Sequence, residues 1–355
     1  MKLIFWAVSL VLFSSFPAMA GDTGGQIEME TLKRIMSPPG NLNFKGTEIQ
    51  ILIGKDGVPV VKKFSVEQKG REFARTQVEG SPQPDEIYIK NQHGTWVYYP
   101  KQEKLIKKEA ADEADAGLPV WDDEKLKKIQ DNYEIKFLKD ANIAGRTCSV
   151  YSFRPKEKGR LVREFWVDTQ SGLPLRIDTY NSDGRLLNIA SFEAIDFNPE
   201  FPQDISQLNL MDQAAQKSPH DVLDVILVPL KKLQETLKDK VMFPGYVPKG
   251  YDLKNVFAQK MKNGERYQII YSDGIAPLSI FQEAMEGAAR PEDIQDLEAV
   301  TIGKEGQGYF KQQGLMKILR FAAGNTKQTI IGEIDKNEIL KIAESFQTIK
   351  GGVKK

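Results

Sequence analysis

The chain has 355 residues, and its 49 basic side chains are balanced by 49 acidic ones, so its formal net charge is zero. This balance gives no reason to expect nucleic acid as a partner, because proteins that bind nucleic acid carry a basic surface. The length suffices for two domains of ordinary size. Cys148 is the single cysteine, so no intrachain disulfide can form. We expect its side chain to be a small buried hydrophobe rather than a reactive thiol.

The first 20 residues are expected to be a secretory signal peptide. Lys2 supplies a basic start, residues 3–16 are almost wholly apolar, and Ala18-Met19-Ala20 offers an A-x-A cleavage site. The apolar run is shorter than the roughly 20 residues that span a bilayer comfortably. We therefore expect cleavage and export from the cytoplasm, and a retained signal anchor is the alternative. The residue directly after the cleavage site is Gly21 and not a cysteine, so a lipid anchor is not expected.

Residues 21–205 are expected to form one β-rich domain. Short helices are predicted over 28–36 and 122–132, where apolar residues recur at helical spacing. Alternating apolar residues between turn signals predict strands at 44–53, 60–68, 71–78, 86–90, 95–99, 101–108, 134–139 and 145–154. Because short turns join most of these strands, we expect a mostly antiparallel sheet with a few helices laid on it.

The most distinctive stretch of this domain runs from Arg163 to Phe192. Two turn segments, Asp168-Thr-Gln-Ser-Gly172 and Ser182-Asp-Gly184, separate β-prone runs. Turns rich in Asp, Ser and Gly between such runs are typical of consecutive antiparallel hairpins. The sequence therefore predicts a β-meander over this stretch.

Residues 206–240 are predicted to form a helical linker between two domains. The run from Asp221 to Leu230 and the charged residues 231–240 together suit an amphipathic helix, with a kink or a break at Pro229. We expect the apolar face of this segment to be buried within the protein. The alternative is a docking surface for a partner helix.

Residues 241–350 are expected to form a smaller second domain. Strands are predicted at 253–261, 266–271, 278–283, 316–323 and 328–332. A terminal helix over 336–346 follows, with Asp335 as its N-cap. The segment Gly303-Lys-Glu-Gly-Gln-Gly308 lacks the Lys-Ser/Thr ending of a phosphate-binding loop, so we expect a hairpin connection there.

Five motifs occur in a fixed order along the chain. Leu42-Asn-Phe-Lys-Gly-Thr47 and Asn142-Ile-Ala-Gly-Arg146 come first, followed by the segment from Trp166 to Arg176. The second half contains Ile270-Tyr-Ser-Asp-Gly-Ile-Ala-Pro-Leu-Ser-Ile-Phe281 and Thr329-Ile-Ile-Gly-Glu-Ile334. Together these motifs resemble those of the MucB/RseB family of periplasmic regulators. The resemblance covers nearly the whole chain after the signal peptide.

The resemblance implies an α+β fold. Its first part is an incomplete antiparallel β-barrel closed by helices over an apolar cavity, as in the lipoprotein carrier LolA. A smaller C-terminal domain, an antiparallel sheet with a helix, follows. The resemblance also implies a periplasmic protein that binds the periplasmic part of a membrane-spanning anti-sigma factor. A homo-oligomer is left open as an alternative to a monomer. Binding would shield that factor from proteolysis and restrain the sigma-E envelope stress response, with lipid or lipopolysaccharide as the releasing signal.

An apolar cavity under a curved sheet can accept an acyl chain. The candidate lining residues, chosen by alternation with their neighbours, are Ile49, Ile51, Phe64, Val66, Trp96, Tyr98, Phe165 and Ile177. Plain core packing is the alternative, because hydrophobicity does not separate a core residue from a cavity wall. Burial of an acyl chain would gain about 0.8 kcal/mol for each CH₂ group. A small cavity would therefore be enough to bind such a chain tightly.

The sequence contains no identifiable catalytic or metal site. His93 and His220 are far apart in the sequence and have no Cys or Glu at ligand spacing, and no G-x-S-x-G nucleophile elbow is present. We therefore expect no enzyme and no cofactor. The main alternative to a regulator is a periplasmic lipid or lipoprotein carrier. An envelope hydrolase, which would depend on unassigned carboxylate pairs, is the least favoured hypothesis.

Overall fold

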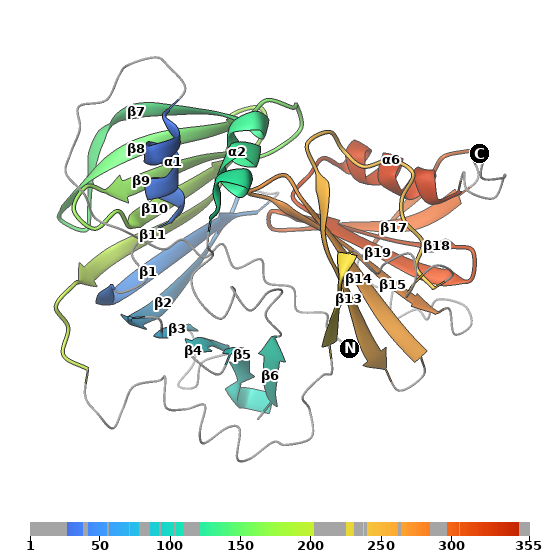
Figure 1. The fold of residues 1–355 in the computed structure, drawn as a ribbon, viewed down its shortest axis with the longest axis horizontal. Coiled ribbons are helices and arrows are strands. Elements are labelled where there is room, and N and C mark those ends of the chain that lie inside the picture. The colour runs from blue at the N-terminus through green and yellow to red at the C-terminus, as the bar shows by residue number, and fades with distance from the viewer. Residues whose placement is uncertain are drawn as a thin grey trace.

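The structure is a computed structural model. It describes residues 27–37, 42–54, 57–70, 72–77, 86–91, 94–102, 104–108, 121–201, 225–230, 237, 240–261, 264–284, 297–304 and 306–347. Two antiparallel sheets that share no strand lie side by side (Figure 1). In this described part of the chain, no helix has the length and apolar character needed to cross a membrane.

The first sheet has eleven strands. They are β1 (Asn43–Ile53), β2 (Pro59–Lys69), β3 (Glu72–Gln77), β4 (Ile87–Asn91), β5 (Gly94–Tyr99), β6 (Lys104–Lys108), β7 (Tyr133–Ile143), β8 (Arg146–Pro155), β9 (Val162–Asp168), β10 (Pro174–Tyr180) and β11 (Leu186–Asp196). A 3₁₀ turn, Pro100–Gln102, precedes β6. The strand order β6-β5-β4-β3-β2-β1-β11-β10-β9-β8-β7 leaves β6 and β7 as edges. The sheet is therefore open rather than a closed barrel, and the expected antiparallel arrangement is confirmed.

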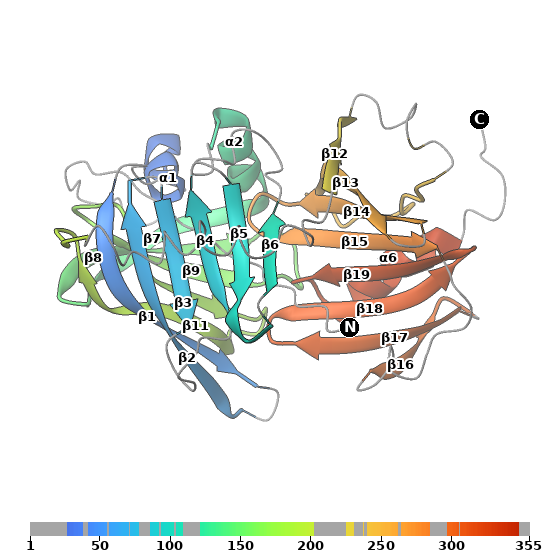
Figure 2. The same ribbon diagram turned by 90° about the horizontal axis from the view of Figure 1, so that it is seen from below.

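Two meanders make up this order, and they meet where β1 pairs with β11. Figure 2 shows β1–β6 in front of β7–β11, because the long sheet curves over on itself. The predicted meander over 163–192 is confirmed, since β9 pairs with β10 and β10 with β11. Asp168 closes the first of its turns. The buried carboxylate of Asp168 accepts hydrogen bonds from Ser171 N (2.8 Å) and from Arg146 Nη2 (2.9 Å).

Two helices, α1 (Met29–Met36) and α2 (Asp123–Asn132), pack against the first sheet. Their buried residues are Leu32, Ile35, Met36, Leu126 and Ile129. These side chains join one core cluster with residues of β7, β8 and β9, among them Tyr133, Phe153 and Phe165. Asp122 is the N-cap of α2, because its Oδ1 accepts a hydrogen bond from Lys125 N (2.8 Å).

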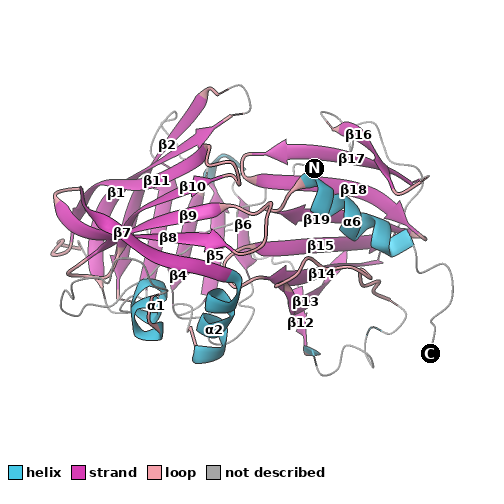
Figure 3. Cartoon of the chain, turned by 90° about the horizontal axis from the view of Figure 1, so that it is seen from above, coloured by secondary structure: helices cyan, strands magenta, loops and turns pink. Residues whose placement is uncertain are grey.

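The second sheet has eight strands in the order β12-β13-β14-β15-β19-β18-β17-β16. They are β12 (Val225–Val228), β13 (Asp252–Met261), β14 (Gly264–Ser272), β15 (Pro277–Ala284), β16 (Glu298–Ile302), β17 (Gly306–Gln313), β18 (Met316–Ala323) and β19 (Thr326–Gly332). Helix α6 (Lys336–Gln347) lies across this sheet (Figure 3). Its buried residues Ile339, Ile342 and Phe346 share a core cluster with Leu319 and Ile330.

The structure differs from the sequence predictions at three strands. The helical linker is wrong for Val225–Val228, which forms β12 and pairs with β13. The reason is that four consecutive apolar residues, two of them β-branched valines, suit a sheet edge, and Pro229 follows directly. Strands β16 and β17 were not predicted. Residues 206–224, 231–236, 238 and 239 of the predicted linker lie outside the described residues, and the domain boundaries at 205 and 240 stay predictions.

Candidate functional site

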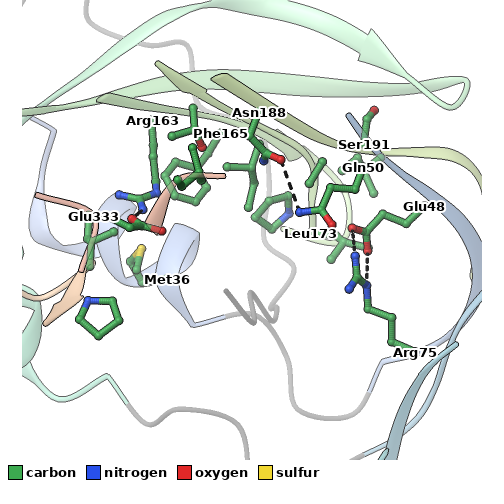
Figure 4. A pocket seen from close by; sticks show the side chains of 18 of the residues that line it. Met36, Glu48, Gln50, Arg75, Arg163, Phe165, Leu173, Asn188, Ser191 and Glu333 are labelled. Carbon is green, nitrogen blue, oxygen red and sulfur yellow. Dashed lines mark hydrogen bonds and ion pairs between the residues drawn. The ribbon is translucent and has the colours of Figure 1, made fainter. Parts of the chain in front are cut away.

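A cavity of about 520 Å³ lies where the two sheets meet. Residues of β1–β3, β9–β11, α1 and the loops before α2 and β10 line it from the first sheet's side. The second sheet's side is lined by Lys254, Asn255, Ile270, Ser272, Gly274, Ile275, Pro277, Leu315 and Glu333. Figure 4 shows the labelled side chains around this cavity. Its size falls within the range of small-molecule pockets, about 300–1,000 Å³.

The wall from the first sheet is largely apolar. Its apolar residues are Phe44, Val66, Phe73, Phe165, Leu173, Leu175, Ile177 and Phe192. Most of them belong to two core clusters, one under β1–β3 and the other under α1 and α2. The cavity therefore lies between two core clusters. Its apolar wall on the side of the first sheet, called the apolar floor below, consists of side chains that already belong to these clusters.

One side of the cavity carries the ion pair between Glu48 on β1 and Arg75 on β3. The guanidinium donates from Nε to Oε2 (3.1 Å) and from Nη2 to Oε1 (2.8 Å). It also lies 3.5 Å from the centroid of the Phe64 ring. This two-pronged pair with a stacked ring fixes Arg75 in place. Next to it, Gln50 Nε2 donates to Asn188 Oδ1 at 3.4 Å (Figure 4).

The other side of the cavity carries a buried ion pair between the two sheets. Nη2 of Arg163, on β9, donates to Oε2 of Glu333, which follows β19. Both side chains are almost fully buried, with 7% and 5% of their surface exposed. Burial alone would lower the pKa of Arg163, but the charges of Glu333 and Asp273 and the hydrogen bond to Glu333 outweigh it and raise that pKa. The guanidinium therefore stays charged.

Beside the cavity, Asp273 joins the first sheet to the second. Its Oδ2 accepts hydrogen bonds from Tyr133 Oη (2.8 Å) and Arg160 Nη1 (3.3 Å), both of the first unit. Its Oδ1 accepts from the backbone N–H groups of Ile275 (3.0 Å) and Ala276 (2.8 Å). Burial, and then the charge of Asp273, hold the pKa of Tyr133 well above its usual value, so the phenol remains a donor.

The last residue of α2 adds a second set of contacts between the two units. Asn132 Nδ2 donates to the carbonyl oxygens of Gly250 (3.0 Å) and Asp273 (2.8 Å). Gly250 has φ +85°, and a Cβ there would overlap Asn132 Oδ1. Gly274 has φ +106°, and a Cβ there would lie 2.9 Å from Ile129 Cγ1. Both turns therefore need glycine, because α2 packs directly on them.

The predicted cavity residues fall into three groups. Val66, Phe165 and Ile177 line the cavity. Phe64 is buried beneath Arg75, while Trp96 and Tyr98 pack against a separate small cluster of Ala74, Ile87 and Ile89. Ile49 and Ile51 are half-buried and alternate along β1 with the lining residues Glu48 and Gln50, so they face away from the cavity. Ligand binding by this set stays a prediction.

Sequence analysis missed the polar residues of the cavity. Glu48, Gln50, Arg163, Asn188 and Glu333 all line it. The sequence did contain a signal for these polar residues. A charged or amide residue inside a β-prone run is unusual unless its side chain has a polar partner on that face of the sheet. Glu333 also lies within the family-like motif Thr329–Ile334, and Arg163 lies three residues before the motif that begins at Trp166.

The described residues contain no group of three or more His, Cys, Asp and Glu side chains that could hold a metal ion. His93 and His220 lie outside the described residues. Cys148 is fully buried, as expected. Burial, with a smaller effect of the Asp168 charge, raises the pKa of its thiol to about 12. A thiol in this state is a poor nucleophile.

Residues 28–216, more than half of the chain, match the family model described as the MucB/RseB N-terminal domain. The chain belongs to the MucB/RseB family. Residues 241–346 match a second model, described as a domain of unknown function (DUF4367). The motifs that pointed to MucB/RseB from the sequence therefore identified the family correctly.

Two curated relatives of this MucB/RseB protein align over similar lengths. An uncharacterized protein of Methanocaldococcus jannaschii is 24% identical over 231 residues, which cover 62% of this chain and 64% of the relative. The sigma-E factor regulatory protein RseB of Escherichia coli is 24% identical over 225 residues, which cover 62% and 61%. Each alignment thus spans less than two thirds of the relative's own length.

A solved structure shares the fold over most of the chain. It is a chain of the Pseudomonas aeruginosa MucA/MucB complex, with a TM-score of 0.58 and 18% sequence identity. The superposition covers 89% of this chain and 96% of that chain. The two-sheet arrangement is therefore shared with that protein.

Proposed function

We propose that this protein is a periplasmic regulator that binds the periplasmic part of a membrane-spanning anti-sigma factor. By covering that segment it would shield the anti-sigma factor from proteolysis and so restrain the envelope stress response. The observation that carries the proposal is membership of the MucB/RseB family, together with a fold shared with the MucA/MucB complex over 89% of the chain. The basic, apolar and A-x-A segments of residues 1–20 support export to the periplasm.

Lipid sensing is the second part of the proposal. The cavity at the junction has an apolar floor and is built from both sheets. A ligand held there would contact both units at once, so it could change how they are held together. This supports a sensor whose affinity for its partner protein depends on the bound ligand. In this proposal the open first sheet has the role that the incomplete barrel has in a lipoprotein carrier.

The experiment is a pull-down of tagged mature protein, residues 21–355, from envelope extract of the source organism, analysed for proteins and lipids. Enrichment of a single-span membrane protein with a cytoplasmic sigma-binding region would support the regulator. Enrichment of acylated lipoproteins or free lipid without such a protein would replace it with a carrier. If no membrane protein is retained, the regulator is abandoned.

Shielding needs a separate measurement. The periplasmic segment captured in the pull-down would be incubated with a periplasmic protease, with and without the mature protein. We expect slower cleavage when the protein is present at concentrations above the Kd of the complex. Equal cleavage rates would leave binding in place but remove the shielding role.

A further inference from the structure

The side chains of β1 and β11 that face away from the cavity form a second surface. Gln50 and Asn188 line the cavity, so their neighbours along each strand point to the opposite face of the sheet. These neighbours are apolar, and β2 continues the same face, because Val61 is paired with Ile51. The set, called the outer patch below, is Ile49, Ile51, Ile53, Pro59, Val61, Leu187 and Ile189.

The outer patch is partly open to solvent. Pro59 and Val61 are exposed, and the other five residues are half-buried. Helices α1 and α2 pack on the cavity face of the sheet, where their core cluster includes Phe165, and α6 packs on the second sheet. Contiguous apolar surface of this kind marks a site of interaction with another molecule.

The outer patch continues onto the tip of the β1–β2 hairpin, which projects beyond the rest of the sheet (Figure 2 and Figure 3). Val58, Val60 and Val61 have 58%, 52% and 51% of their surface exposed. Val60 and Val61 point to opposite faces of this two-stranded ribbon, so both faces of the tip are apolar and exposed. Among the described strands, β3 pairs with β2 only from Phe64 onward, so the edge of the tip is open as well.

Basic side chains lie directly behind the apolar tip. The described charged residues there are Lys62, Lys63, Arg185, Asp183 and Glu193. Lys63 pairs with Glu193 at 2.7 Å, and Arg185 Nη2 donates to the carbonyl oxygen of Gly54 at 3.1 Å, which holds the guanidinium beside the hairpin. An apolar end with an excess of bases behind it is how interfacial segments bind a bilayer, because the cations meet anionic headgroups while the apolar side chains enter the layer beneath.

We propose that the hairpin tip and the outer patch dock on the surface of a membrane that contains anionic phospholipids. The exposed valines enter the boundary between headgroups and acyl chains, with Lys62 and Arg185 at the level of the phosphates. The open backbone edge of β2 limits the depth, because N–H and C=O groups without partners are not tolerated in the hydrocarbon core. The protein therefore lies on the membrane rather than in it. This inference goes beyond the proposed function and does not depend on the anti-sigma factor.

A second copy of the chain fits this surface less well than a bilayer. A strand added at the edge of β2 would cover neither face of the tip, so Val60 and Val61 would both stay exposed. Contact between two tips would also bring the Lys62 side chains of both copies together, and like charges across such a contact are unfavourable. A bilayer surface adapts to a projecting ribbon and covers both of its faces at once.

The test is co-sedimentation of the full mature chain with vesicles of phosphatidylcholine mixed with phosphatidylglycerol. The double variant Val60→Thr/Val61→Thr keeps the β-branched shape of both side chains, but its hydroxyl groups oppose burial, so it should bind about tenfold more weakly. Lys62→Gln should bind the mixed vesicles about fivefold more weakly and should equal the wild type on phosphatidylcholine alone.

Leu138→Thr is the matched control. Leu138 is an exposed apolar residue, with 46% of its surface exposed, on β7 at the far edge of the same sheet. Its replacement removes apolar surface without touching the hairpin, so this variant should bind both kinds of vesicle like the wild type. An equal loss in Leu138→Thr and in Val60→Thr/Val61→Thr would overturn the proposal, because binding would then reflect general apolar exposure.

A fluorescent probe reports the contact itself and does not depend on the threonine variants. Cys148 is buried, so an environment-sensitive dye can be attached selectively to Val60→Cys in the folded protein. The dye emission should shift to shorter wavelength when mixed vesicles are added, whereas the same dye on Leu138→Cys should not shift. No shift at position 60 overturns the proposal.

Failure of the wild type to bind the mixed vesicles, or equal binding by Val60→Thr/Val61→Thr, also overturns it. Light scattering without vesicles tests the second copy as occupant. A wild-type dimer that becomes a monomer in the double variant would replace the membrane by self-association. The anti-sigma factor is absent from all these measurements, so this proposal and the proposed function fail separately.

Discussion

Asp273 is the residue through which the two units hold each other most directly. It is fully buried, and its carboxylate accepts hydrogen bonds from Tyr133, Arg160 and two backbone N–H groups. A carboxylate in this position is stabilised only while all its donors stay in place, because a buried charge without compensation is costly. The Ser-Asp-Gly motif that resembled the family is thus a structural joint in this protein.

The Asp273→Asn substitution should lower the free energy of unfolding by about 3–5 kcal/mol, because it leaves the Arg160 charge buried without its partner. Urea unfolding followed by tryptophan fluorescence measures the loss. Asp252→Asn is the matched control. Asp252 pairs with Lys128 at 2.6 Å, but its side chain is 77% exposed, so this change should cost less than about 1 kcal/mol. Equal costs for the two variants would show that Asp273 does not hold the junction.

Cys148 should resist alkylation in the native protein. Burial raises the pKa of the thiol from 9.0 to about 12, so it stays protonated and inaccessible at pH 8. Iodoacetamide labelling followed by mass spectrometry should show modification only in denaturant. The same shift has a consequence for stability, since a raised folded pKa favours the fold below pH 9 and this contribution is lost as the pH rises toward 12. Rapid labelling of the native protein would contradict this environment.

Among the elements, α2 has the most direct role in joining the sheets. Its apolar stripe packs on the first sheet, while its last residue, Asn132, hydrogen-bonds to two turns of the second. The contact is so close that both turns carry glycine where α2 approaches. A helix that belongs to one core by its apolar face is thus attached to the other unit by its C-terminal end.

Gly250→Ala and Gly184→Ala separate the effect of this contact from that of backbone strain. The two glycines have nearly the same φ, +85° and +82°, but a Cβ at Gly184 has nothing within 4 Å. We expect Gly184→Ala to cost about 1–2 kcal/mol through the left-handed conformation alone. Gly250→Ala should cost about 1–3 kcal/mol more, since displacing Asn132 breaks its two hydrogen bonds. Thermal unfolding of both variants measures the two losses. Equal shifts in Tm would show that the contact between Gly250 and Asn132 adds nothing to the stability of the protein.

Most elements could be predicted from the sequence because their local signals are strong. Helices α1, α2 and α6 have apolar residues at helical spacing, and the hairpins of β9–β11 have Asp- and Gly-containing turns. Strands β12, β16 and β17 could not be predicted in this way. The apolar run of β12 fits a helix or a buried strand equally well by periodicity, and β17 has two glycines, Gly306 and Gly308, that weaken any strand pattern.

The site was less predictable than the fold. Alternation predicts which residues share a face of a strand, but not which face lies toward the cavity. On β1 the apolar choice, Ile49 and Ile51, gave the opposite face from Glu48 and Gln50, which line the cavity. The polar side chains of Glu48 and Gln50 can face the cavity because Arg75 and Asn188 pair with them. These partners lie on other strands, which only the tertiary fold brings next to β1.

For the molecule as a whole, the junction is largely polar, although Ile275 of the second unit packs against the core cluster of α1, α2 and β7–β9. One core cluster belongs to the second sheet and α6, and three others to the first sheet and its helices. The polar contacts between the two units include the Arg163–Glu333 and Arg160–Asp273 ion pairs, the hydrogen bonds of Asn132 and an isolated β-bridge between Arg160 and Ile334. Because most of each cluster lies within one unit, we expect each core to persist when the junction opens.

A double variant, Asp273→Asn with Asn132→Ala, should unfold in two steps instead of one. The physical reason is that loss of the junction leaves each core to melt at its own temperature. Differential scanning calorimetry of the mature chain would resolve the two transitions, and the wild type is the reference. A single transition at lower temperature in the double variant would show that the two cores depend on each other through other contacts.

The seam between β1 and β11 has a consequence for how the cavity comes into being. Glu48 and Gln50 of β1 and Asn188 of β11 stand on its two sides, and Gln50 and Asn188 are 138 residues apart in the sequence. The two meanders consist of local hairpins, which form quickly, whereas closing so long a loop is slow. We therefore expect the cavity to form late in folding: both meanders can assemble first, and only their final pairing completes its wall.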